Sequence, residues 1–275
     1  MASTSFDLTD LGVLITGGAS GIGKAIAAGM LEHGAKVMIG SRTTEKVEAA
    51  VKDLNRQVEI IDEESHVAGV SLDVTKDASV ERAIHKTVDL FGRLDVLVNS
   101  AGVLVKKPTF ELDLDEFNQL HETHVTGTLR CCQAAGQLMR EQHAGCIINL
   151  ASISSFVDLV EVTAYAAAKN AILGLTRGLA NEWAKFGIRT NAIAPGFIPT
   201  DLNRKMLEGT DRGRRILEHT PMARFGTPEE IAGGAVFLAS PAAGFVNGHT
   251  LVIAGGYLAS GIGDSFAPWA DPSKE

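Results

Sequence analysis

The sequence has few cysteines, no visible secretory signal pattern and no long hydrophobic run. It contains only three cysteines, Cys131, Cys132 and Cys146, an odd number without the spacing of a disulfide framework or a zinc site. The first residues lack a basic stretch followed by an apolar one, which is the pattern of a secretory signal. No apolar run approaches the ~18 residues that a membrane span needs. We therefore expect a cytoplasmic protein with buried free thiols and no membrane partner.

Positive charge is also scarce. The 275 residues include 25 Lys and Arg against 33 Asp and Glu, a formal net charge of -8. A nucleic-acid partner would need clustered basic side chains that neutralise phosphates, so we expect none. The densest basic run, Arg212-Gly213-Arg214-Arg215, predicts a solvated loop or the start of a helix. Apolar residues are plentiful, at 45% against 21% charged, which is enough for a packed core.

Short apolar runs alternate with longer helical stretches along almost the whole chain. This alternation predicts right-handed β-α-β units and a parallel sheet with helices on both faces. We therefore predict an α/β fold, one doubly wound, seven-stranded parallel sheet in a single domain spanning residues 1–275. The periodicity fades at about 197–225, which we interpret as a mobile segment, and a tail follows from about 258. The predicted strands contain Val13–Ile15, Lys36–Ile39, His66–Val70, Asp95–Val98, Cys146–Leu150, Thr190–Ile193 and Thr250–Ile253.

A glycine-rich turn joins the first predicted strand to the first predicted helix. It reads Thr16-Gly17-Gly18-Ala19-Ser20-Gly21-Ile22-Gly23, and helical periodicity continues to His33. Such a turn lets backbone N–H groups approach a pyrophosphate, whose charge the N-terminus of the helix favours. The spacing is G-x-x-x-G-x-G, and an isolated loop of this kind is as compatible with an ordinary turn. With a strand before it and a helix after it, the loop predicts dinucleotide binding by a Rossmann-type sheet.

The residues after the second predicted strand indicate which dinucleotide binds. A site for NAD commonly places an acidic residue there, which pairs with the ribose hydroxyls. This chain has Gly40-Ser41-Arg42, so a hydroxyl and a guanidinium are available for a 2′-phosphate and no carboxylate repels it. We predict NADP(H) as the cofactor. The alternative is that Arg42 is a solvated residue at a helix start and that NAD(H) binds equally well.

A tyrosine and a lysine one helical turn apart suggest proton transfer. Tyr165 and Lys169 occupy positions i and i+4 of a helical run, so they project from one face. A phenol has a pKa of ~10 in water, and a nearby ammonium together with oxidised nicotinamide should lower it. Ser152 follows a predicted strand at the carboxyl edge, where open α/β sheets bind ligands. We predict that Ser152 hydrogen-bonds the substrate oxygen, that Tyr165 donates the proton and that the nicotinamide supplies a hydride.

Taken together, these motifs resemble the short-chain dehydrogenase/reductase family over residues 8–257. The resemblance implies a dehydrogenase or reductase that uses NAD(P) and interconverts CH–OH groups and carbonyls of a small molecule. It also implies a homotetramer or a dimer. The matching motifs are Thr16-Gly17-x-x-x-Gly21-Ile22-Gly23, Leu72-Asp73-Val74, Asn99-Ser100-Ala101-Gly102, Ser152, Tyr165-x-x-x-Lys169 and Pro195-Gly196.

The family resemblance further implies individual roles. Asp73 would contact the adenine, the Asn99–Gly102 turn would support the cofactor, and Thr200 would hold the nicotinamide carboxamide. The residues expected to bind the cofactor are Gly17, Ser20, Gly21, Ile22, Gly23, Ser41, Arg42, Asp73, Val74, Asn99, Ala101, Gly102, Tyr165, Lys169, Pro195, Gly196, Ile198 and Thr200.

Within the family, several stretches are most similar to members that act on sugar acids and polyols, of the gluconate 5-dehydrogenase and 2-dehydro-3-deoxygluconate 5-dehydrogenase type. The alternatives are a reductase of 3-oxoacyl thioesters, a general ketone reductase, and a catalytically silent nucleotide-sensing protein with the same fold. Lys106 and Lys107, where sugar-acid members often have Arg, face either a substrate carboxylate or solvent.

One catalytic position departs from the family pattern. His124 stands where an Asn usually supports a water that links the catalytic lysine to solvent. We predict that His124 joins this proton relay, and a packing residue is the alternative. Because free imidazole titrates near pH ~6.5, a relay role predicts a titration step in the usual assay range. His121 lies three residues earlier, but no third ligand has suitable spacing, so we predict no metal site.

Overall fold

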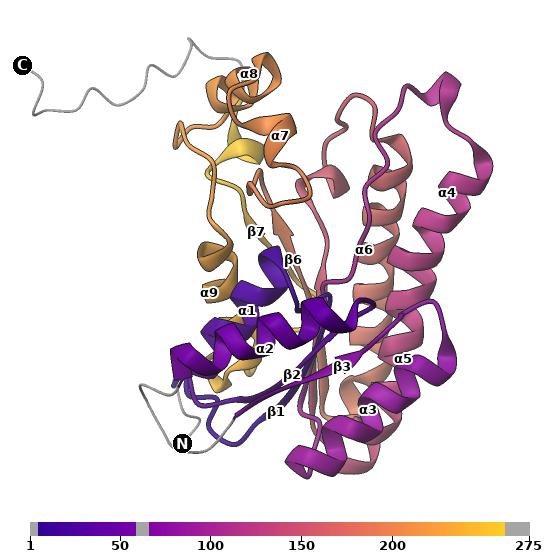
Figure 1. Ribbon diagram of the computed structural model, residues 1–275, viewed down its shortest axis with the longest axis vertical. Coiled ribbons are helices and arrows are strands. Elements are labelled where there is room, and N and C mark those ends of the chain that lie inside the picture. The colour runs from indigo at the N-terminus through magenta and orange to yellow at the C-terminus, as the bar shows by residue number, and fades with distance from the viewer. Residues whose placement is uncertain (1–4, 59–65, 262–275) are drawn as a thin grey trace, which may run out of the picture.

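A computed structural model describes residues 5–58 and 66–261 of the chain. Seven parallel strands form one sheet in the order β3-β2-β1-β4-β5-β6-β7, which confirms the predicted α/β fold (Figure 1). Every predicted strand falls on an observed one. The strands are β1 Gly12–Thr16, β2 Lys36–Ser41, β3 Val67–Ser71, β4 Val96–Asn99, β5 Gly145–Leu150, β6 Ile188–Pro195 and β7 Thr250–Ile253.

Helices cover both faces of the sheet, as the alternation of elements requires. Helices α1, α2 and α9 lie on one face, and α3, α5 and α6 lie on the other (Figure 1). None of the described helices is long and apolar enough to cross a membrane. The helices are α1 Gly21–Glu32, α2 Thr44–Val58, α3 Asp77–Phe91, α4 Leu114–His121, α5 Gly127–Gln142, α6 Thr163–Trp183, α7 Arg204–Leu207, α8 Asp211–His219 and α9 Pro228–Ala239.

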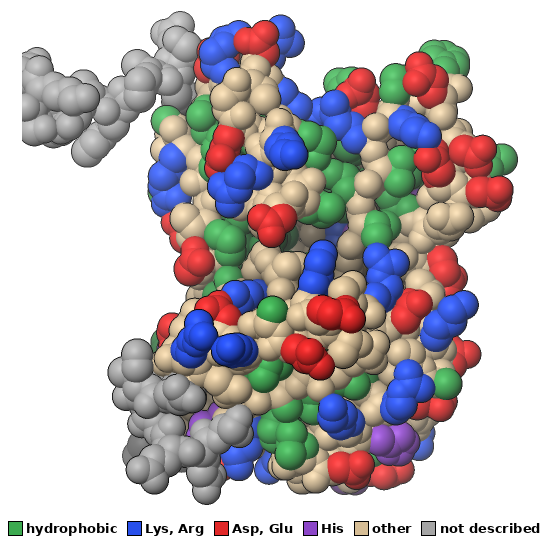
Figure 2. Space-filling model, viewed as in Figure 1, with side chains coloured by type: hydrophobic (Ala, Val, Ile, Leu, Met, Phe, Trp, Pro, Cys, Tyr) green, Lys and Arg blue, Asp and Glu red, His purple; other side chains and the backbone are tan. Residues whose placement is uncertain are grey.

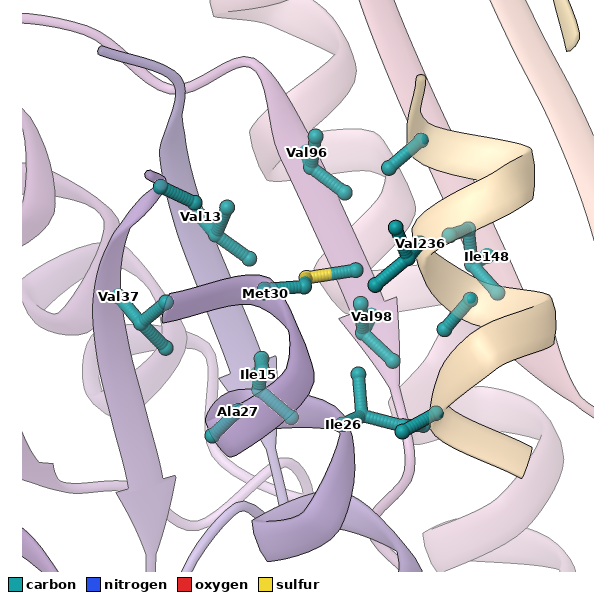
Figure 3. Close-up of a cluster of buried hydrophobic side chains, with 14 of the residues drawn as sticks. Val13, Ile15, Ile26, Ala27, Met30, Val37, Val96, Val98, Ile148 and Val236 are labelled. Atoms are coloured by element: carbon teal, nitrogen blue, oxygen red, sulfur yellow. The ribbon is translucent and has the colours of Figure 1, made fainter. Parts of the chain in front are cut away.

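The side chains of the central strands alternate between two buried layers, because successive residues of a strand point to opposite faces. Ile15 of β1 packs in the cluster that includes Met30 of α1 and Val236 of α9. Figure 3 shows Met30 pointing from α1 toward Val98 and Val236. Leu14, the neighbour of Ile15, packs in the opposite cluster, under α3 and α5. The sheet is therefore a rigid, doubly buried platform for the loops at its carboxyl edge.

The segment at 197–225 has more regular secondary structure than its weak periodicity predicts. It contains the short helices α7 and α8, and Thr210 caps α8 by accepting a hydrogen bond from the Gly213 N–H at 3.0 Å. The basic run that begins at Arg212 forms the first turns of α8, which confirms a helix start. The predicted C-terminal tail lies mostly outside the described residues, which end at 261.

Candidate active site

A cleft runs across the carboxyl ends of β1 to β5, at the point where the strand order reverses direction between β1 and β4. Doubly wound sheets bind ligands at this switch point. The structure brings most of the residues predicted to bind the cofactor to this one cleft. They are Gly17, Ser20, Gly21, Ile22, Gly23, Ser41, Arg42, Asp73, Val74, Ala101, Gly102, Tyr165, Lys169 and Thr200.

The glycine-rich turn after β1 is held close to the turn after β4. Gly17 has a φ of +68°, and a Cβ atom at this position would lie 2.8 Å from the Cα atom of Ala101. Thr16 fixes the same approach, because its Oγ1 accepts hydrogen bonds from the N–H groups of Ser100 and Ala101, both at 3.1 Å. A Cβ atom on Gly23 would lie 2.5 Å from the Gly17 carbonyl oxygen. The absence of side chains therefore keeps this cradle narrow and its backbone exposed to a ligand.

The far end of the cleft is basic. Ser41, Arg42 and Lys46 line it, and Arg42 and Lys46 form no ion pair within the described residues. Burial alone would raise the pKa of Asp73, but hydrogen bonds from Thr75 and the charge of Arg42 lower it below the ordinary value. Sequence reasoning missed Lys46, which lies in the first turn of α2 and lines the same cleft as Arg42.

Some residues predicted to bind the cofactor do not line this cleft. Asn99 is buried beneath it and donates a hydrogen bond from Nδ2 to Oδ1 of Asn149 at 2.9 Å. Pro195 is buried at the end of β6, and Ile198 packs in the core. Gly196 lines the neighbouring pocket instead. The contacts of Asn99, Pro195 and Ile198 with the cofactor stay predictions, because burial of a side chain leaves its backbone groups free to approach a ligand.

Ser152, Tyr165 and Lys169 meet beside this cleft. Ser152 begins a short 3-10 turn after β5, and its Oγ accepts a hydrogen bond from the Ser154 N–H at 3.1 Å. Tyr165 and Lys169 lie on the buried side of α6, with the Lys169 ammonium 5.5 Å from the centre of the Tyr165 ring. The ammonium donates a hydrogen bond to the Leu150 carbonyl oxygen at 2.5 Å. The sheet edge and one helix thus place a hydroxyl, a phenol and an ammonium together.

Burial changes the acidity of both ionisable groups. It raises the pKa of Tyr165, and a hydrogen bond with Ser152 opposes this change. Burial also lowers the pKa of Lys169 to about 7, because the charged ammonium is poorly solvated there. Lys169 is thereby poised to exchange a proton near neutral pH. The lowered phenol pKa expected from the sequence depends on nicotinamide as well as Lys169, so it stays a prediction.

His124 lies against the same tyrosine. It belongs to a π-helical turn, Glu122–Thr126, between α4 and α5, and its ring meets the Tyr165 ring edge to face at 5.5 Å. Its Nε2 is 2.7 Å from the Val103 carbonyl oxygen. Burial, with the nearby charge of Lys169, lowers the pKa of His124 to about 3. The predicted titration in the usual assay range is therefore wrong, because the imidazole stays neutral there. Helical π-turns often occur at functional sites.

A second pocket opens on the other side of Ser152 and Tyr165. Figure 2 shows the molecule hollowed between the part that carries α7 and α8 and the part that carries α4, with hydrophobic side chains on the walls and Lys and Arg nearby. We call it the substrate pocket. Tyr165 lines both this pocket and the cleft. Its lining residues are Leu104, Lys106, Ser152, Ile153, Ser154, Leu159, Val162, Tyr165, Gly196, Phe197, Leu202, Asn203, Met206, Leu207 and Arg212.

The residues that line the cleft fit a dinucleotide. Its glycine cradle would be filled by any Cβ atom, and its basic end offers a hydroxyl and two cations. Within residues 5–58 and 66–261, no group of three His, Cys, Asp or Glu side chains could hold a metal ion.

Comparisons with known proteins agree with this geometry. The profile of a family described as Enoyl-(Acyl carrier protein) reductase matches residues 17–258. The chain is 41% identical to D-threitol dehydrogenase of Mycolicibacterium smegmatis over 89% of this chain and 91% of that protein. It is 36% identical to 5-keto-D-gluconate 5-reductase of Escherichia coli, over 92% of this chain and 97% of that protein.

A solved structure gives the same result in three dimensions. A gluconate 5-dehydrogenase from Burkholderia cenocepacia, in complex with NADP and tartrate, superposes with a TM-score of 0.87 and is 33% identical. The match covers 93% of this chain and 98% of that one. The fold of this chain therefore agrees with that of the Burkholderia cenocepacia enzyme over almost the whole of both chains. The chain belongs to the short-chain dehydrogenase/reductase family and is an oxidoreductase of CH–OH groups.

Proposed function

We propose that the protein uses NADP(H) to interconvert a carbonyl and a secondary alcohol on a sugar, a sugar acid or a polyol. One observation carries this proposal: Tyr165 stands on the wall shared by the cleft and the substrate pocket, with Ser152 and Lys169 beside it. A group in this position can deliver a proton to a substrate oxygen while the carbon next to it faces the cleft. The relatives named for threitol and 5-keto-D-gluconate support the substrate class.

Each residue of the site has its own role in the reduction of a carbonyl. The Ser152 hydroxyl orients the carbonyl oxygen of the substrate, and the Tyr165 hydroxyl donates the proton that this oxygen gains. Lys169 stabilises the resulting phenolate and returns a proton to it. NADPH, when bound, supplies the hydride that adds to the carbonyl carbon. His124 extends the path from Lys169 toward solvent as a neutral imidazole, which can accept at one ring nitrogen and donate at the other.

Ser41 and Arg42 favour NADP(H) over NAD(H), with NAD(H) as the weaker alternative. The Arg42 guanidinium has no ion-pair partner in the described part of the chain, so a 2′-phosphate would not have to displace one. The relative from Burkholderia cenocepacia binds NADP. The segment at about 197–225 would act as a lid, because α7 and α8 contribute Met206 and Arg212 to the substrate pocket.

The surface and the thiols support proposals for the assembly and the compartment of the protein. We expect a homotetramer, with a dimer as the alternative, because the edge strand β7 leaves Val252 exposed and Phe245 lies fully exposed near it. Native mass spectrometry would measure the assembly. Cys131, Cys132 and Cys146 are buried as free thiols, which favours the reducing cytoplasm.

A substrate screen tests the proposed function. NADPH oxidation, and NADP⁺ reduction with the corresponding alcohols, would be followed with sugar acids, ketoses, polyols, acetoacetyl thioesters and aromatic ketones. Turnover of a sugar acid, sugar or polyol, abolished in Tyr165→Phe with NADPH binding retained, is the expected result. Preferred turnover of thioesters would make the chain a 3-oxoacyl-thioester reductase. Binding of NADPH without turnover of any compound would indicate a nucleotide-sensing protein.

A further inference from the structure

Arg212 stands over the substrate pocket with most of its hydrogen-bonding capacity unused. It lies in the first turn of α8, lines the pocket with Ser152 and Tyr165, and is 31% exposed at its side chain. Its guanidinium approaches Glu161 at 3.9 Å, too far for a hydrogen bond. In the described part of the chain this guanidinium donates no hydrogen bond at all. A partly buried guanidinium normally uses several of its five N–H groups.

A second cation, Lys106, lines the same pocket and approaches the same carboxylate as Arg212. Lys106, from the loop after β4, also lines the pocket, and its ammonium lies 2.8 Å from a Glu161 carboxylate oxygen. The hydrogen bond from Lys106 lowers the pKa of Glu161, and the charges of Lys106 and Arg212 act in the same direction. Glu161 therefore stays ionised and balances one of the two positive charges. One positive charge remains at this end of the pocket.

The neutral polar side chains of the pocket already have hydrogen-bond partners, a role at the reacting oxygen or no access to the pocket. The Asn203 side chain donates to the Ile198 carbonyl oxygen at 3.0 Å and accepts from the Thr200 N–H at 2.8 Å. Ser152 and Tyr165 serve the reacting oxygen, and Ser154 is almost completely buried. The rest of the wall is aliphatic or aromatic, and it includes Leu104, Leu159, Val162, Phe197, Met206 and Leu207. A neutral polyol would find few partners there, whereas an anionic group would find two cations.

We propose that Arg212, together with Lys106, binds a carboxylate of the substrate, so that the physiological substrate is a hydroxy acid or its oxo acid. This inference rests on the proposed function and narrows it from sugars, sugar acids and polyols to the acids. A guanidinium suits the role because its planar N–H groups match a carboxylate with two parallel hydrogen bonds.

The test compares two substrates that differ only in this charge. D-Gluconate and D-glucitol share their central hydroxyl groups and differ at C1, where one has a carboxylate and the other a hydroxymethyl group. D-Threonate and D-threitol form a second pair. With NADP⁺, the wild-type protein should oxidise the acid of at least one pair with the higher kcat/KM. Arg212→Gln and Lys106→Gln should each raise the KM for that acid about tenfold, since a hydrogen bond to a charged group is lost.

Two neighbouring residues provide matched controls. Arg214 lies on the same helix but pairs with Glu218 at 2.5 Å, and Lys107 follows Lys106 but pairs with Glu116 at 2.6 Å. Neither lines the substrate pocket. Arg214→Gln and Lys107→Gln should leave the preference for the acid unchanged. Raised salt should increase the KM for the acid and not for the polyol, because it screens half-exposed charges.

Two results would overturn the inference while the proposed function stands. One is a wild-type protein that oxidises the polyols as efficiently as the acids. The other is an Arg212→Gln variant whose kcat/KM falls equally for both members of a pair, which would give Arg212 a purely structural role. If the wild-type protein turns over neither these compounds nor any other carbonyl or alcohol of the screen, the proposed function fails and the inference fails with it.

Discussion

The Nε2 atom of His124 lies 2.7 Å from the carbonyl oxygen of Val103, and the same imidazole meets the Tyr165 ring at a right angle. A Cβ atom on Gly102 would lie 2.6 Å from Cε1 of His124. The His124 ring is thus held between the turn after β4 and Tyr165. Its pKa of about 3 means that it is neutral wherever the enzyme is assayed.

This contact predicts how His124 variants behave. His124→Asn should remain active, because an amide can still donate to the Val103 carbonyl oxygen. His124→Ala should slow turnover about tenfold or more if the relay is broken, since positioned proton transfer contributes ~10²–10⁴-fold. The solvent isotope effect on kcat should grow in the Ala variant.

Neither variant should remove a step from the pH–rate profile between pH ~5 and 8, the range in which an ordinary histidine would titrate. Val103 and Tyr165 fix the ring, so His124→Ala also serves as a test of packing. A variant that loses thermal stability but keeps the wild-type kcat and isotope effect would show that His124 only packs.

The lowered pKa of Lys169 predicts that the folded protein becomes more stable toward unfolding as the pH rises above about 7. Its pKa is about 7 in the folded chain and ~10.4 in an unfolded one. Between these values the unfolded state binds more protons, so the free energy of unfolding should rise as the pH increases through this window. Below pH 7 both states carry the charge, and the full penalty of burying it is present.

The measurement is urea unfolding without cofactor at pH ~6.5 and ~9.5, for the wild-type protein and for Lys169→Met. The stability difference between the two proteins should change with pH, to the relative advantage of the wild type at the higher pH. Equal pH dependence in both proteins would mean that the ammonium is not desolvated in the folded state.

The rate of carbonyl reduction should also fall as the pH rises through about 7, because Lys169 loses the proton that it returns to Tyr165.

Cofactor preference depends on Ser41 and Arg42. Replacing Ser41 with Asp and Arg42 with Ala should reverse the preference, because a carboxylate would then face the 2′-phosphate and pair with ribose hydroxyls instead. Fluorescence titration with NADPH and NADH measures this directly. Lys46→Gln alone should weaken NADPH several-fold and leave NADH unaffected. A wild-type protein that binds NADH more tightly than NADPH would refute the assignment.

The sequence predicted the sheet well because its central strands β1, β2, β4, β5 and β6 are apolar runs buried on both faces. Val13–Ile15 is one example: its neighbouring residues point to opposite layers, and both layers are hydrophobic. The glycine turn was predictable for a similar reason, since the strand before it and the helix after it restrict what the turn can do. Local pattern and tertiary environment agree at these positions.

Other features depend on contacts that no local pattern encodes. His124 lies in a π-helical turn and is buried beside Val103. This burial lowers its pKa, and the sequence pattern does not reveal it. Arg212 belongs to a basic run whose pattern predicts solvated surface. Arg214 of this run forms an ion pair with Glu218 on the same helix, whereas Arg212 lines the substrate pocket. Helices α7 and α8 are too short to be stable alone, so packing against the rest of the chain determines them.

Gly17 provides the last prediction, and Gly92 provides its control. Both have a left-handed backbone, with φ of +68° and +79°. A Cβ atom on Gly92 would meet nothing within 4 Å, whereas one on Gly17 would lie 2.8 Å from the Ala101 backbone. Gly92→Ala should therefore cost only the left-handed penalty of roughly 1–2 kcal/mol.

Gly17→Ala should cost that penalty and, in addition, push the turn after β1 away from the turn after β4, because backbone atoms of Ala101 cannot yield as a side-chain end can. We expect a larger loss of unfolding free energy, measured by urea denaturation, and a loss of NADPH affinity that Gly92→Ala does not show. Equal destabilisation of the two variants, with NADPH affinity intact in both, would mean that the close approach of Gly17 to Ala101 does not shape the cofactor cleft.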